Sequence, residues 1–150
     1  MVELAIAGKA SFLASSYEID RPGFTYTSDT LAGLKRDFPE DEFFFIIGGD
    51  SLMKFHHWVK PEVISAYATL LAAGRNGYTS ETLMQQAEQL NQVFQTKVLF
   101  LEMPEYNISS KEIRQFCKIE QYDTIQDFLP ETVLDYIRIH RLYQTEKTGA

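Results

Sequence analysis

The feature that constrains this chain most is the segment EFFFIIGGD at residues 42–50. Its apolar run at 43–47 does not alternate with polar residues, which is typical of a central strand in a parallel sheet that helices cover on both faces. Gly48 and Gly49 then let the backbone approach a ligand closely, and Asp50 adds an acceptor for a ribose hydroxyl or a metal-bound water. The segment therefore predicts an α/β protein whose ligand site lies just past this strand.

Strand and helix patterns alternate along the rest of the chain. Strands are expected at residues 12–19, 43–47, 69–73 and 98–101, and helices at residues 1–8, 28–38, 61–67, 80–94, 109–118 and 130–140. Ser28 and Ser80 are the expected N-caps of two of these helices. This order predicts an α/β fold with a Rossmann-like, mainly parallel sheet, right-handed crossovers and a helical C-terminal part.

Composition excludes several classes of function. The 150 residues include 45% hydrophobic and 23% charged side chains, which suits one globular domain. The net charge of -7 and the lack of a dense Lys or Arg run argue against a nucleic-acid partner. No segment reads as a signal peptide or a membrane span. Cys117 is the only cysteine and is expected to be a small buried hydrophobe, so a reducing cytoplasm fits best.

A second chemically informative segment is NISSKEIR at residues 107–114. Ser109 and Glu112 have the spacing of a capping box, so the first amides of a helix point outward from its start. With Ser110, Lys111 and Arg114 nearby, this helix start could bind a polyphosphate. A well-capped surface helix explains the same residues equally well.

Other single residues also have two interpretations. Trp58 is either a core aromatic or a ligand-stacking group, and Asp50 is a helix cap, a ribose ligand or both. His56 and His57 are expected to be solvated or hydrogen bonded, because adjacent residues rarely point at one metal ion.

Taken together, four segments resemble bacterial nicotinate-nucleotide adenylyltransferase. These are the stretch through FTYTSDTL, the strand and turn FFFIIGGDSLMKFHHW, the segment NISSKEIR, which is similar to the ISSTxIR signature, and the ending FLPETVLDYIRIHRLY. The resemblance covers nearly all of residues 1–143 and leaves 144–150 as a tail. It implies a nucleotidyltransferase fold that transfers AMP from ATP to nicotinate mononucleotide with Mg²⁺, in NAD biosynthesis.

The resemblance also implies roles for individual residues. The amides of Thr27, Ser28 and Val59 would hold the nicotinate carboxylate, and Trp58 would stack on the pyridine ring. Tyr106 would either contact the same ring or pack in the core. Asp50 would hold ribose hydroxyls. The residues implied to face ATP are Gly48, Arg75, Ser109, Ser110, Lys111 and Arg114.

Two departures from the family pattern change these expectations. Lys111 stands where the signature has Thr, which exchanges a hydroxyl for a long cation. The GxFDPxHxGH segment, whose histidines contact the triphosphate, does not occur, so the resemblance assigns no catalytic residue. We therefore expect an incomplete domain that lacks on the order of 60 residues. The strand at 43–47 should then present an open edge and favour self-association.

Two rival functions remain open on the sequence. Beside the nicotinate mononucleotide reaction, one alternative is a catalytically inactive nucleotide-binding module. The other is a related adenylyltransferase that uses nicotinamide mononucleotide or a pantetheine phosphate. Trp58 and the amides of Thr27 and Ser28 favour the acid form of the pyridine nucleotide.

Overall fold

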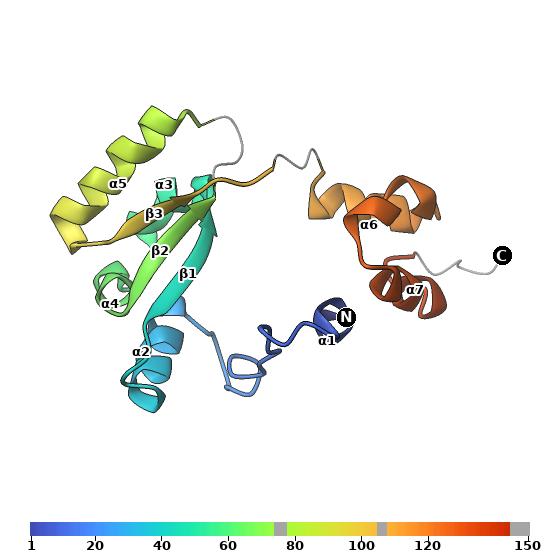
Figure 1. Ribbon diagram of the computed structural model, residues 1–150, viewed down its shortest axis with the longest axis horizontal. Coiled ribbons are helices and arrows are strands. Elements are labelled where there is room, and N and C mark those ends of the chain that lie inside the picture. The colour runs from blue at the N-terminus through green and yellow to red at the C-terminus, as the bar shows by residue number, and fades with distance from the viewer. Residues whose placement is uncertain (74–77, 105–107, 145–150) are drawn as a thin grey trace. The chain divides into compact units, whose positions relative to one another are not determined.

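The computed structural model describes residues 1–73, 78–104 and 108–144, and the chain divides into two compact units (Figure 1). The sheet unit is residues 16–105, and the helical unit combines residues 1–15 with residues 106–150. No helix in the described ranges is long and apolar enough to cross a membrane.

The described part of the sheet unit contains three parallel strands in the order β1-β2-β3. Its elements are α2 (Thr27–Asp37), β1 (Phe43–Gly48), α3 (Gly49–Lys54), the 3-10 turn η1 (Phe55–His57), α4 (Pro61–Tyr67), β2 (Ala68–Ala73), α5 (Ser80–Phe94) and β3 (Val98–Leu101). Phe43 is in register with Ala68, and Leu70 with Val98. The carboxyl ends of the strands therefore lie at one edge of the sheet, where ligands of open α/β sheets usually bind. The predicted parallel α/β arrangement is confirmed.

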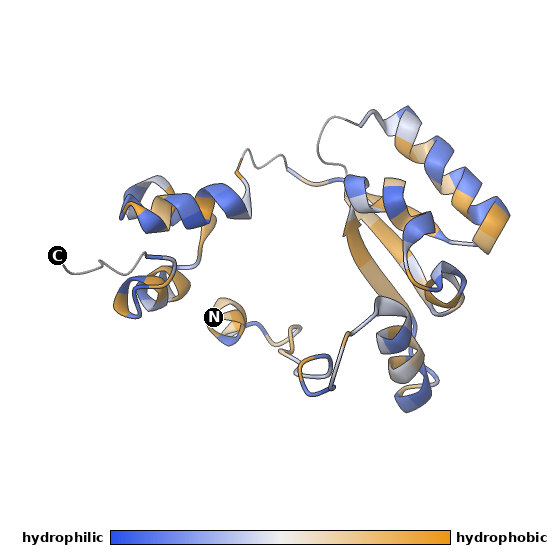
Figure 2. Ribbon diagram, turned by 180° about the vertical axis from the view of Figure 1, so that it is seen from behind, coloured by the Kyte–Doolittle hydropathy of each residue, from blue (hydrophilic) through white to orange (hydrophobic). Residues whose placement is uncertain are grey.

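The core of the sheet unit lies on one face of the sheet. It consists of Leu31, Ile47, Leu52, Phe55, Ile64, Ala68, Leu70, Ala72, Leu83 and Leu90. Alternate residues of β1 point the other way, and Phe44 and Ile46 are 53% and 65% exposed. Figure 2 shows the hydrophobic colouring of these strands. The prediction that both faces of β1 are covered is wrong within this unit, because the helices that contribute to the core all pack on one side.

β1 pairs only with β2 among the described strands, so its other edge is open. The predicted strand at 12–19 is absent, and these residues form turns and irregular chain. The backbone N–H of Asp20 donates to the carbonyl of Ser16 at 2.9 Å, and the Ser16 hydroxyl donates to the Asp20 carboxylate at 2.6 Å. Such local hydrogen bonds favour a turn over a sheet ladder.

Two predicted helix caps are displaced by one residue or more. α2 begins at Thr27, with Tyr26 as its N-cap, so Ser28 lies buried inside the first turn. α5 is capped by Thr79, whose hydroxyl accepts a hydrogen bond from the backbone N–H of Thr82 at 3.2 Å. Ser and Thr are both good N-caps, so the sequence at 79–80 allowed either position. Tyr26 makes no side-chain cap, so no capping residue marks the start of α2 in the sequence.

The helical unit has its own apolar core. Its elements are α1 (Val2–Ile6), α6 (Ser110–Lys118), the 3-10 turns η2 (Tyr122–Thr124) and η3 (Gln126–Phe128), and α7 (Glu131–Ile139). Cys117, Ile125 and Leu134 are among its buried residues, so the expected burial of the cysteine is confirmed. Burial also raises the pKa of the Cys117 thiol, which keeps it protonated and unreactive.

Candidate functional site

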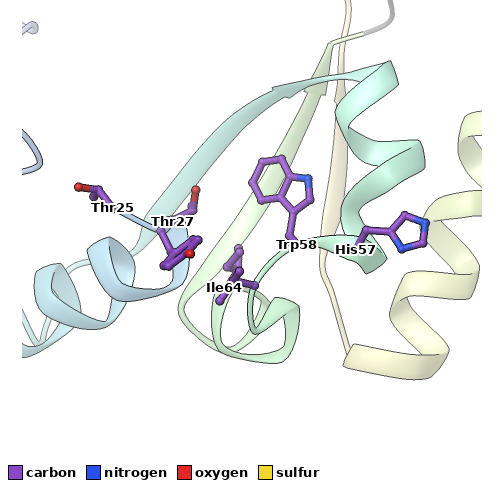
Figure 3. Close-up of a pocket in the computed structure, with 7 residues that line it drawn as sticks. Thr25, Thr27, His57, Trp58 and Ile64 are labelled. Atoms are coloured by element: carbon purple, nitrogen blue, oxygen red, sulfur yellow. The ribbon is translucent and has the colours of Figure 1, made fainter. Parts of the chain in front are cut away.

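A cavity of about 320 Å³ opens in the sheet unit between the start of α2 and the segment after η1 (Figure 3). Its lining residues are Thr25, Tyr26, Thr27, His57, Trp58, Val59 and Ile64. This volume lies at the small end of the range for sites of small organic ligands. Three of the predicted substrate residues, Thr27, Trp58 and Val59, therefore meet at one cavity although they come from distant parts of the sequence.

The start of α2 lies at one side of this cavity, which Thr27 lines, whereas Ser28 is not among the lining residues. The N-cap Tyr26 makes no side-chain cap, and the amides of Thr27 and Ser28 lie in the first turn, where a helix offers no acceptor. The hydroxyl of Ser28 is fully buried, and it has no hydrogen-bond partner among the described residues. Unpaired donors together with the positive end of the helix dipole suit an anionic group such as a carboxylate.

Trp58 forms an aromatic wall of the cavity. Its indole packs on Phe55, with ring centroids 5.6 Å apart, and meets Phe45 edge to face at 6.1 Å. In Figure 3 the indole and Thr27 lie on opposite sides of the cavity, whereas the ring of His57 points away from Thr27. Both interpretations of Trp58 are thus compatible, because one part of the ring packs on the core and the remainder lines the cavity.

An ion pair connects the two sides of the cavity. The Nζ atom of Lys60 lies 4.0 Å from Oδ1 of Asp29, which is in the first turn of α2. Lys60 has a left-handed backbone (φ 51°) at the N-cap of α4, so the chain turns sharply just after Trp58 and Val59. Both side chains are largely exposed, and the pair adds little stability.

Gly48 and Asp50 lie at the carboxyl end of β1, as predicted, but they are not among the residues that line this cavity. A Cβ atom at Gly48 would lie only 2.6 Å from Oδ1 of Asp50, so glycine leaves room for that carboxylate. Gly48 is the N-cap of α3, and Asp50 lies exposed in the first turn. The interpretation of Asp50 as the cap itself is wrong, and a ribose-binding role stays a prediction.

The predicted capping box at the start of α6 is confirmed. The backbone N–H and the hydroxyl of Ser109 donate to Oε2 of Glu112 at 2.8 and 2.6 Å, and the Ser109 hydroxyl accepts from the Glu112 N–H at 3.2 Å. The Glu112 carboxylate therefore already accepts the hydrogen bonds from the backbone N–H and the hydroxyl of Ser109. Ser110 and Lys111 in the first turn of α6, and Arg114 one turn further on, are exposed.

Loss of this cap should destabilise α6 in a pH-dependent way. The Ser109 hydroxyl and backbone N–H hold the pKa of Glu112 below its usual range. Such a carboxyl stabilises the fold above its unfolded-state pKa, and this contribution disappears as the pH falls through the lower folded-state pKa. We expect Ser109→Ala to cost about 1 kcal/mol of unfolding free energy at neutral pH, and less in acid. Urea unfolding across pH measures this cost.

A matched control for this substitution is Thr79→Ala. It removes an N-cap that has no carboxylate partner, so its cost should not vary with pH. An equal pH dependence of the two variants would contradict the prediction, as would an unchanged pKa of Glu112 in Ser109→Ala by NMR titration.

Two predicted residues, Arg75 and Tyr106, lie outside the described residues. The described ones are shared between the units, with Thr27, Ser28, Gly48, Asp50, Trp58 and Val59 in the sheet unit and Ser109, Ser110, Lys111 and Arg114 in the helical unit. Sequence reasoning missed Thr25, Tyr26, His57 and Ile64 as cavity residues. Thr25 and Tyr26 directly precede Thr27 within the segment FTYTSDTL that carries the resemblance, and this was the available signal.

Comparison with curated proteins gives matches over almost the whole chain. A protein of Lachnoclostridium phytofermentans named probable nicotinate-nucleotide adenylyltransferase is 39% identical over 143 residues, which are 95% of this chain and 70% of that protein. A Thermus thermophilus protein of the same name is 38% identical over 144 residues, 96% of this chain and 70% of its own length. No family model matches the chain.

Solved structures agree in fold. The nicotinic acid mononucleotide adenylyltransferase of Plasmodium falciparum, complexed with APC, superposes with a TM-score of 0.72 at 20% identity, over 95% of this chain and 71% of that one. The same enzyme complexed with NaAD gives a TM-score of 0.69 at 21% identity, over 95% and 69% of the two chains. At this level of identity the likeness establishes the fold alone.

Proposed function

We propose, because this chain belongs to the nicotinate-nucleotide adenylyltransferase family, that it transfers AMP from ATP to nicotinate mononucleotide and so forms nicotinate adenine dinucleotide and pyrophosphate. Family membership rests on 39% identity to a curated member over 143 residues. The observation that carries the substrate assignment is the cavity, where an aromatic wall at Trp58 lies opposite Thr27 in the first turn of α2, whose amides have no acceptor within the helix (Figure 3). A flat ring that carries a carboxylate matches both features.

The nicotinate group is proposed to bind in this cavity. Its carboxylate would accept hydrogen bonds from the amides of Thr27, Ser28 and Val59, and its ring would stack on Trp58. The dipole of α2 favours an anion at this end by about 0.3–1 kcal/mol. An amide carries no charge, so the same contacts would bind nicotinamide mononucleotide less tightly, and this disfavours the rival acceptor.

The remaining predicted residues are proposed to hold the rest of the two substrates. Asp50 would accept ribose hydroxyls, with Gly48 beside it. Ser110, Lys111 and Arg114 would bind ATP phosphates, since an ammonium and a guanidinium suit them and these side chains are exposed at the start of α6. Ser109 would contribute less to phosphate binding than the family pattern implies, because its N–H and hydroxyl already donate to Glu112. Arg75 and Tyr106 stay in the proposal as ATP-binding and nicotinate-contacting residues.

The proposed chemistry needs no covalent enzyme intermediate. A phosphate oxygen of the mononucleotide attacks the α-phosphorus of ATP, the bond to the β-phosphate breaks, and pyrophosphate leaves. The protein then contributes by placing the two phosphates in line and by stabilising the charge that builds up on them.

Mg²⁺ is the metal proposed to accompany ATP. Within residues 1–73, 78–104 and 108–144, no three His, Cys, Asp or Glu side chains come together as a metal-binding group. Mg²⁺ usually keeps several waters and binds substrate phosphates with one or two carboxylates, so the phosphates of ATP would carry most of its coordination. When bound, the ion would neutralise phosphate charge.

Calorimetry and an assay of pyrophosphate release test the proposal together. We expect the protein to bind nicotinate mononucleotide more tightly than nicotinamide mononucleotide or a pantetheine phosphate. With ATP and Mg²⁺, dinucleotide and pyrophosphate should appear in equal amounts. Binding without dinucleotide formation would favour the inactive module instead, and tighter binding of another acceptor would overturn the substrate assignment.

The proposed domain consists of both units, residues 1–143, with residues 144–150 as a tail. The matches with the curated relatives support this, because they run through both units and cover 95% of the chain.

We also propose that the open edge and exposed face of β1 pair with a second copy of the chain. Phe44 and Ile46 offer exposed apolar surface beside the unpaired edge. Ile46→Lys should weaken self-association about tenfold or more, because burial of one isoleucine contributes about 1.5–3 kcal/mol. Sedimentation velocity over a range of protein concentrations measures this change.

Met84→Lys is the matched control for that substitution. It adds the same charge to an exposed apolar side chain on α5, away from the edge. A protein that sediments as a monomer at every concentration, or an equal effect of both substitutions, would contradict the proposal.

A further inference from the structure

One wall of the cavity is formed by a loop with no regular structure of its own. Residues 16–26 contain neither helix nor strand, yet Thr25 and Tyr26 at the end of this loop line the cavity. The position of this wall therefore depends on what anchors the loop to the rest of the sheet unit.

One anchor is the close contact between the side chain of Tyr17 in the loop and Gly33 in α2. Gly33 is buried in the middle of α2, where glycine costs about 1 kcal/mol relative to alanine. A Cβ atom at this position would overlap the hydroxyl oxygen of Tyr17 and would lie 3.2 Å from its Cζ and 3.3 Å from Nη2 of Arg21. The glycine thus leaves the space that the tyrosine hydroxyl fills.

Further contacts hold the loop to the same face of α2. The Tyr17 hydroxyl donates to Oδ2 of Asp37 at 3.3 Å, and the Thr30 hydroxyl donates to Oε1 of Glu18 at 2.6 Å. Thr30, Gly33 and Asp37 follow helical spacing and so share one face.

Residues further along the loop contact Tyr17 and Glu18, the same two residues that hold the loop to α2. The Thr25 hydroxyl donates to the carbonyl of Glu18 at 3.4 Å, and the guanidinium of Arg21 stacks on the Tyr17 ring at 4.4 Å. Thr25 is thereby tied through Glu18 to α2, and Thr25 itself lines the cavity.

We propose that Tyr17 and Gly33 are positioning residues for the mononucleotide cavity, and that their close contact sets the placement of Thr25 and Tyr26 against Trp58. This inference rests on the proposed function, since the cavity is taken to bind the nicotinate group. It predicts that a methyl group added at Gly33 displaces the loop without unfolding α2.

The decisive variant is Gly33→Ala. Alanine favours the helix, so the unfolding midpoint should stay near that of the wild type, whereas the displaced wall should weaken binding of nicotinate mononucleotide about tenfold. A purely structural residue would change stability and binding together. Calorimetry measures the affinity, and thermal unfolding measures the stability.

The second variant tests the contact directly. Tyr17→Phe removes the oxygen atom that the new methyl group would overlap, while the contacts of Glu18 with Thr30 and Thr25 still hold the loop. The double variant Gly33→Ala with Tyr17→Phe should therefore regain most of the lost affinity. Tyr67→Phe, which removes a hydroxyl from a partly exposed tyrosine of α4, is the matched control and should bind as the wild type does. Wild-type affinity in Gly33→Ala, or no recovery in the double variant, would overturn the inference.

Acrylamide quenching of tryptophan fluorescence gives a readout that does not need the substrate. Trp58 is the only tryptophan, so the signal reports the opposite wall of the cavity alone. Quenching should be stronger in Gly33→Ala than in the wild type and should return to the wild-type level in the double variant. Equal quenching in all variants would count against the inference. If the wild type fails to bind nicotinate mononucleotide, the proposed function fails while this comparison still tests the loop.

Discussion

Replacement of Trp58 by alanine should weaken the binding of nicotinate mononucleotide about tenfold to a hundredfold, since loss of one aromatic stacking partner costs about 1–3 kcal/mol. The indole is fixed by Phe55 and Phe45 before any ligand arrives, so little ordering of this side chain opposes binding. Calorimetric titration measures the change in affinity.

Trp58→Phe separates stacking from packing in this prediction. Phenylalanine keeps an aromatic face and most of the contact with Phe55, so it should retain more affinity than alanine at a similar unfolding midpoint. Equal affinity of the wild type and Trp58→Ala would contradict the stacking role. If binding and stability fell in parallel in both variants, Trp58 would be a core residue only.

The sequence predicted the regular elements well where local signals decide them. The strand at 43–47, the helix beginning at Pro61 and the capping box at Ser109 were all confirmed, because each depends on residues within one or two turns. The open edge of β1 also agrees with the expectation, since β1 pairs only with β2 among the described strands. The burial of β1 was predicted wrongly, since an apolar run does not reveal on how many faces helices will pack.

The predicted strand at 12–19 failed for a related reason. Phe12, Leu13 and Ile19 suggest a strand by composition, but all three are exposed, and the serine and aspartate beside them form a turn. A strand needs a neighbour to pair with, and no local pattern provides one.

The candidate site was predictable in part. Thr27, Trp58 and Val59 were named together only through the family resemblance, and the structure places all three at one cavity. The contact between Tyr17 and Gly33 joins residues 16 positions apart, and no periodic pattern connects a loop tyrosine to a glycine inside a helix. The roles of Asp50 and of the α6 residues stay predictions.

Replacement of Phe55 by alanine should have the largest effect on stability, with a loss of about 3–5 kcal/mol of unfolding free energy. Phe55 is 0% exposed in the core of the sheet unit, so the change leaves a cavity there and also removes the ring on which Trp58 rests. Phe44→Ala is the matched control, because Phe44 is half exposed on β1 and its loss should cost far less. Urea unfolding compares the two variants, and equal costs would contradict the placement of the core.

The same substitution should also affect binding, because the ring of Phe55 supports Trp58. The fraction of Phe55→Ala protein that stays folded should bind nicotinate mononucleotide less tightly than Phe44→Ala protein does. This result would connect the stability of the core to the shape of the cavity.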